Sequence, residues 1–189
     1  MNGGIRFHRG SAPATAGLGR MGDGATGWIA WPSAGSLDAE VPARVRAAIT
    51  RALLDIGVVT LLVDEPHRTA TKLRQGWPRN LLAPPLYRIT TREPAAIAAL
   101  FDDPVQGWWL GSAVALVSDP HAPPPAPDAA TWRALAGDRW TAAAARLPAI
   151  QGVLRAGVDG EFAGWWSRTD AIRIRFEAAL RDQPPIGRG

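Results

Sequence analysis

The sequence contains no cysteine and no long run of apolar residues. Without thiols the chain can form neither disulfides nor thiolate nucleophiles, and zinc sites built on cysteine are excluded. The longest nearly apolar stretch, residues 107–117, is too short to cross a bilayer as a helix. The first residues show no apolar segment of the kind found in secretory signals. We therefore expect a soluble, cytoplasmic protein with no membrane partner.

Motifs of acyl-transfer and nucleotide chemistry are also missing. The sequence has no Gly-x-Ser-x-Gly elbow and no P-loop. Residues 17–22 fit G-x-G-x-x-G as a string, but the pattern predicts no strand before them and no clear helix after them. We therefore expect no cofactor, and no motif in the sequence marks a metal site.

The apolar periodicity that is present predicts an α/β (mixed α+β) fold. Strands are expected at 27–31, 58–63, 86–90, 113–117, 153–158 and 161–166, the last two joined by an Asp-Gly hairpin turn. Helices are expected at 41–56, 94–102, 128–147 and 169–181. Gly137-Asp138 can divide the third helix, and the last segment also fits a strand. We expect one mixed β-sheet of about five to six strands, covered by three to five helices.

The composition divides the chain into three parts. Residues 1–26 have few large apolar side chains and are expected to form an irregular N-terminal arm. Residues 27–182 are expected to form a single domain, and residues 183–189 a frayed tail. The core is predicted to contain Val45, Ile49, Leu53, Val59, Leu61, Val63, Ile97, Leu100 and Trp132.

Tryptophan is unusually frequent, with nine copies against one tyrosine. Trp132 and Trp140 share an apolar helix face and are expected in the core. Neighbours in a strand point to opposite faces, so one member of each adjacent pair, Trp108-Trp109 and Trp165-Trp166, is a candidate for an outward position. Outward tryptophans would serve recognition, and inward ones would fill the core.

Polar residues follow several predicted strands. Two strand–helix–strand units, 27–63 and 86–117, suggest crossovers between parallel strands, whose carboxyl ends share one edge. That edge would gather the candidate catalytic residues Asp64, Glu65, His67, Asp119 and His121. Carboxylates beside histidines can perform acid–base catalysis. The alternative is that these are ordinary turn and capping residues.

The strongest charge feature is a basic segment, residues 66–92, with six cations and no acid. Residues 1–65 carry six basic and six acidic side chains, and residues 93–189 carry nine and eleven, so this segment supplies the net positive charge. Its candidate partner-binding residues are Arg68, Lys72, Arg74, Trp77, Arg79, Arg88 and Arg92. The alternative is that these cations are solvated or pair with acids such as Glu93, Asp102 and Asp103.

Three functions remain open from the sequence. We expect a non-catalytic binding module, of adaptor, inhibitor or toxin-neutralising type, that engages a protein with an acidic surface through the basic segment. A small enzyme, hydrolase-like or metal-assisted, using the strand-end carboxylates and histidines is the first alternative. A nucleic-acid-binding protein is the second, although a net charge of +4 is modest for that function.

Overall fold

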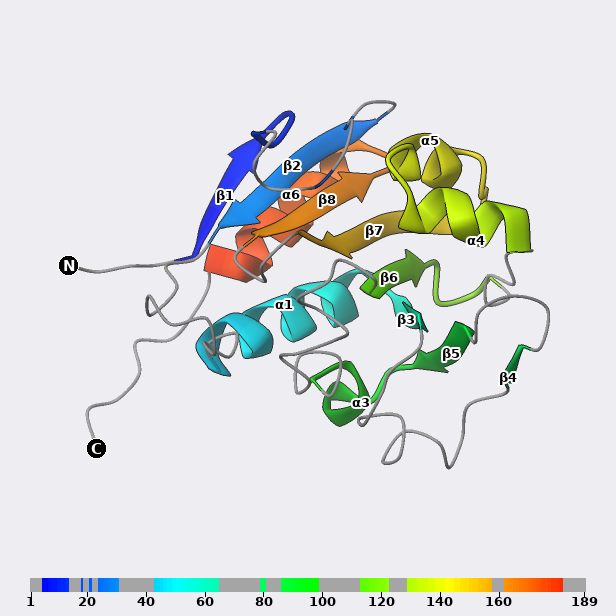
Figure 1. The fold of residues 1–189 in the computed structure, drawn as a ribbon. Helices are drawn as coiled ribbons and strands as arrows, with labels where there is room; N and C mark the ends of the chain where they lie inside the picture. Colours follow the sequence, from blue (N-terminus) through cyan, green and yellow to red (C-terminus); the bar gives the residue numbers. More distant parts are fainter. Residues whose placement is uncertain are drawn as a thin grey trace, which may run out of the picture.

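The computed structural model describes residues 5–13, 18, 21, 24–30, 43–64, 79–80, 86–98, 113–122, 129–157 and 162–181. They form one antiparallel sheet with helices on both faces (Figure 1). The strands are β1 (Arg6–Arg9), β2 (Ala25–Ala30), β3 (Val58–Asp64), β4 (Arg79–Asn80), β5 (Leu86–Thr91), β6 (Ala113–Ser118), β7 (Ile150–Ala156) and β8 (Phe162–Ser167). The helices are α1 (Ala43–Ile56), α3 (Pro94–Ala98), α4 (Ala129–Ala136), α5 (Trp140–Ala145) and α6 (Asp170–Arg181). The expected α+β class, with a single helix-covered sheet, is confirmed.

The order of strands in the sheet is β1-β2-β8-β7-β6-β3-β5-β4, and every neighbouring pair runs antiparallel. The strands joined by a helix, β2 to β3 and β5 to β6, do share a direction, because an odd number of strands separates them. Three strands stand between β2 and β3, and β3 itself stands between β5 and β6. The expected pairing of parallel neighbours is therefore wrong, and the sheet has more strands than the predicted five to six.

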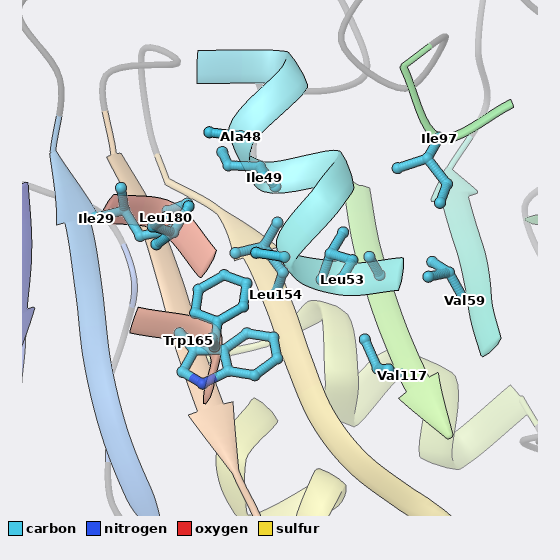
Figure 2. Close-up of a cluster of buried hydrophobic side chains, with 14 of the residues drawn as sticks. Ile29, Ala48, Ile49, Leu53, Val59, Ile97, Val117, Leu154, Trp165 and Leu180 are labelled. Carbon is cyan, nitrogen blue, oxygen red and sulfur yellow. The ribbon is translucent and has the colours of Figure 1, made fainter. Parts of the chain in front are cut away.

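Helices α1 and α6 cover one face of the sheet. The first core cluster joins Ala48, Ile49 and Leu53 of α1 to sheet residues such as Leu154 and Trp165 (Figure 2). The predicted core residues Val45, Ile49, Leu53, Val59, Leu61 and Ile97 are confirmed as buried. Leu100 and the side chains of Val63 and Trp132 lie outside the described part of the chain.

Helices α4 and α5 cover the other face of the sheet. The second core cluster is centred on Trp140 and Trp166, and it includes Leu18 and Met21 from the N-terminal region. The indole nitrogen of Trp140 donates a hydrogen bond to the carbonyl of Leu18, at 2.8 Å. Gly137 and its neighbours separate α4 from α5, as the sequence predicts.

The expected irregular arm, residues 1–26, contains a strand that the sequence pattern does not predict. Residues 6–9 form β1 and pair with β2, which itself begins at Ala25. The ring of Phe7 packs edge-on against Phe176 of α6, with centroids 6.3 Å apart. The sequence pattern misses this strand because four residues are too few to show a period and its apolar partners are distant in the chain.

Strands β7 and β8 form the predicted hairpin, and residues 170–181 form the predicted helix. Trp165 and Trp166 point to opposite faces, but both are almost fully buried. Since helices cover both faces of the sheet, neither tryptophan faces outward. None of the described helices is long and apolar enough to cross a membrane.

Gly57 follows α1 directly. A Cβ atom at this position would lie 2.1 Å from the carbonyl oxygen of Ser118, at the end of β6. The close approach of that neighbouring main chain therefore requires glycine here.

Candidate functional site

The predicted strand-end set is divided between two ends of the sheet. Val63 of β3 pairs with Ala113 of β6, and Val58 pairs with Ser118. Asp64, at the end of β3, and Asp119, just after β6, are thus separated along the strands by about 20 Å, at about 3.3 Å per residue. A single site containing both carboxylates is ruled out, because β3 and β6 are antiparallel rather than parallel neighbours.

Asp119 stabilises the turn that follows β6 through two hydrogen bonds. The Oδ1 atom of Asp119 accepts a hydrogen bond from the backbone N–H of His121 at 2.8 Å, and its carbonyl accepts one from Ala122. This is the local side-chain-to-backbone pattern of an Asx turn. His121 is exposed beside it. The geometry assigns Asp119 a structural role, while Glu65 and His67 lie outside the described residues.

The hydroxyl groups near the end of β5 also have structural partners. Thr90 and Thr60 share a hydrogen bond between their hydroxyls at 2.9 Å, which joins β5 to β3. The hydroxyl of Thr91 accepts a hydrogen bond from the backbone N–H of Glu93 at 2.8 Å, just before α3. Within the described ranges, no three or more histidine and carboxylate residues are grouped as a metal site would require.

The described part of the basic segment builds one edge of the sheet. Arg79 lies on β4, where it pairs with Tyr87, and Arg88 lies on β5, where it pairs with Leu62. Strand β4 ends the strand order, so these cations belong to the two outermost strands on that side (Figure 1). Arg68, Lys72, Arg74 and Trp77 lie outside the described residues.

Arg92 follows β5 and is exposed. In the part of the chain that the structure describes, no ion pair involves this side chain, although Glu93 is its neighbour. Acids elsewhere do pair with arginines: Glu177 and Asp170 on α6, and Asp55 on α1. The pairing that the sequence allowed between this arginine and Glu93 is not formed.

A buried ion cluster that the sequence analysis missed connects α6 to β1. The carboxylate of Glu177 is only 6% exposed and accepts hydrogen bonds from Arg173 at 3.2 Å, from Arg9 at 3.4 Å and from Arg181. Arg173 also bonds Asp170 at 2.8 Å. The i, i+4 spacing of Arg173, Glu177 and Arg181 was the available signal. Each charged group in this cluster has a partner of opposite charge, so we assign the cluster a structural role in holding α6 against β1.

A second buried cation holds the junction between α4 and α5. Arg155 on β7 donates a hydrogen bond from Nη1 to the carbonyl of Gly137 at 2.9 Å. Burial lowers the pKa of its guanidinium below the ordinary value, and the negative charge of nearby Asp138 partly offsets that shift. Arg155 thus positions the turn between the two helices over the sheet.

A hollow of about 640 Å³ lies between α1 and α3. Its walls are mostly small side chains, and Thr50, Arg51 and Asp55 supply its polar groups. Asp55 already accepts from Arg175 of α6. Thr50 is buried, and its hydroxyl has no hydrogen-bond partner among the described residues. Sequence reasoning missed this hollow because it lies beside the apolar stripe of α1, at positions that read as solvent-facing.

Comparison of the chain with family models, with curated proteins and with solved structures finds no match in any of the three.

Proposed function

We propose that this chain is a non-catalytic binding module, of adaptor, inhibitor or toxin-neutralising type, that engages an acidic protein surface through the basic segment 66–92. One observation carries the proposal. The longest stretch with cations and no acid, residues 66–92, includes β4 and β5, the outermost strands on one side of the sheet. A partner can approach that side without displacing another strand of the described sheet.

Electrostatics supports this use of the segment. Opposed potentials raise the rate of association and select among partners, and they act over about 8–10 Å at physiological salt. Arg92 is exposed and forms no ion pair with another described residue, so binding there would break no ion pair within the described part of the chain. Three described acids, Asp55, Asp170 and Glu177, pair with arginines outside the basic segment.

The two alternatives have less support. The enzyme alternative requires Asp64 and Asp119 to lie at the same end of the sheet, and the antiparallel pairing of β3 and β6 places them at opposite ends. Nucleic acid would meet the same cations, but residues outside the segment carry a net charge of −2, which follows from 15 basic and 17 acidic side chains. This negative net charge disfavours contacts with many phosphates, which nucleic-acid binding requires.

The test compares two charge-reversal variants. Arg79→Glu with Arg92→Glu changes the basic edge, and Arg139→Glu with Arg146→Glu makes the same change of net charge at exposed positions beside α5. Tagged wild type and both variants are used to capture proteins from source-cell extract, with and without nuclease. The captured protein is then purified and titrated against each at about 50 and 200 mM salt.

We expect the wild type and the Arg139/Arg146 variant to bind the same protein, more weakly at the higher salt, and the Arg79/Arg92 variant to bind at least about tenfold more weakly. Equal binding by both variants would overturn the proposal. Captured material that disappears with nuclease would favour the nucleic-acid alternative instead.

A further inference from the structure

Strand β1 ends the sheet on the side opposite the basic segment. Within the described part of the chain it pairs with β2 alone, along residues 6–9 (Figure 1). The other outermost strand, β4, has only two residues. Of the two edges, β1 therefore offers the longer row of main-chain groups to an added strand.

The register shows which main-chain groups of β1 face away from the sheet. The N–H of Gly10 donates to the carbonyl of Thr26, one step beyond the pairing of Arg9 with Gly27. Hydrogen-bonded pairs alternate along an antiparallel ladder, so residues 6, 8 and 10 bond β2. The N–H and C=O groups of Phe7 and Arg9 consequently point outward, and no hydrogen bond between described residues uses them.

Side chains on both faces hold β1 in place. Phe7 packs against Phe176, and Arg9 contacts Glu177 at 3.4 Å, both on α6. On the other face, His8 stacks on Trp28 of β2, with centroids 4.1 Å apart and planes 14° from parallel. An edge strand fixed in this way loses little conformational entropy when another strand adds to it.

The charge of the strand defines the chemistry of its partner. Arg6 and Arg9 are exposed, one toward each face, and β1 contains no acid. If two copies of β1 paired antiparallel, outward Phe7 would face outward Arg9 of the other copy, and the two copies of Arg9 would then lie diagonally about 7–8 Å apart, which is unfavourable for like charges. Acidic side chains at matching positions would be attracted instead.

We propose that β1 accepts an extended acidic segment of another protein as an added strand of the sheet. Main-chain hydrogen bonds to Phe7 and Arg9 would supply affinity, and acidic side chains near Arg6 and Arg9 would supply selectivity. This site is at the edge opposite the basic segment, and it does not depend on the function proposed for that segment.

The test uses a labelled peptide of about eight residues in which two glutamates, three positions apart and therefore on opposite faces of a strand, stand among valines, with a lysine-for-glutamate peptide as its control. Binding is measured by fluorescence anisotropy against the wild type, Arg9→Ala and Arg9→Pro. Both variants lose the contact with Glu177, but only proline also removes the outward N–H, and proline is tolerated on an edge strand at such a position. The difference in peptide affinity between the two variants therefore measures the contribution of the main-chain hydrogen bond.

We expect the glutamate peptide to bind the wild type at least about tenfold more tightly than the lysine peptide. Arg9→Ala should weaken binding several-fold, and Arg9→Pro should weaken it further by about tenfold, the effect of one lost hydrogen bond. Thermal melts of the two variants should coincide. In the wild type, the peptide should slow amide hydrogen exchange at Phe7 and Arg9.

Three results would overturn the proposal: equal affinity of Arg9→Ala and Arg9→Pro, equal binding of both peptides, or no binding of the glutamate peptide. If the proline variant does not fold, amide hydrogen exchange at Phe7 and Arg9 of the wild type tests the proposal by itself. Unchanged exchange at Phe7 and Arg9 in the presence of bound peptide would place the peptide elsewhere.

Discussion

Trp165 of β8 and Phe176 of α6 stack face to face, with ring centroids 3.8 Å apart and planes 6° from parallel. Both rings are fully buried, and the contact joins β8 to the last helix. It shows that the C-terminal helix is part of the main core, since α6 also packs along α1.

We predict that Trp165→Ala lowers the free energy of unfolding by about 3–5 kcal/mol, because it leaves a large cavity under α6. Trp28→Ala, at a half-buried tryptophan on the other face, should cost clearly less. Urea denaturation of the three proteins measures both values. A similar loss for the two variants would mean that the Trp165–Phe176 contact is not central to the core.

Local patterns in the sequence predict several elements well. The stripe of Val45, Ile49 and Leu53 predicts α1, and the apolar runs on either side of the Asp-Gly pair in the sequence predict the paired strands β7 and β8. These features depend on neighbours in the chain, where a period of 3.6 or 2 residues can be read directly.

Strand order is not local, and the sequence does not reveal it. Nothing near β3 indicates that β6 will lie beside it or that three strands will separate it from β2. The candidate edge failed for this reason: Asp64 and Asp119 both follow strands, but the strands end on opposite sides. The ion cluster around Glu177 was hidden similarly, because Arg9 is 168 residues away in the chain.

Thr50 offers a test of hydrogen bonding in the helix layer. Its hydroxyl is buried and has no partner in the part of the chain that the structure describes, whereas the hydroxyl of buried Thr60 bonds that of Thr90. Thr50→Val should therefore raise the free energy of unfolding by about 1 kcal/mol, and Thr60→Val should lower it by about 1 kcal/mol. Denaturant titration of both variants checks the signs. A loss of stability in Thr50→Val would reveal a hydroxyl partner that this arrangement lacks.

Glu177 pairs with three arginines whose side chains differ in exposure. Arg173 is buried with it, while the side chains of Arg9 and Arg181 are 66% and 70% exposed. Removing one partner of a buried pair leaves an uncompensated charge, so Glu177→Ala should cost about 3 kcal/mol. Arg181→Ala, at an exposed partner, should cost no more than about 1 kcal/mol. Thermal or urea unfolding distinguishes this ordering from equal contributions by the arginines.

Charge reversal at Arg79 and Arg92 should weaken partner binding while leaving the stability of the fold nearly unchanged. Arg92 is exposed and forms no ion pair with another described residue, so reversing its charge with that of Arg79 should change the free energy of unfolding by less than about 0.5 kcal/mol. Association with an acidic partner should respond differently. The loss of opposed charges lowers both the association rate and its dependence on salt. Stopped-flow association rates at several ionic strengths, measured beside a thermal melt, test the two effects together. A clearly lower melting temperature with an unchanged salt dependence would assign these arginines to the stability of the sheet edge, and the proposed binding surface would be wrong.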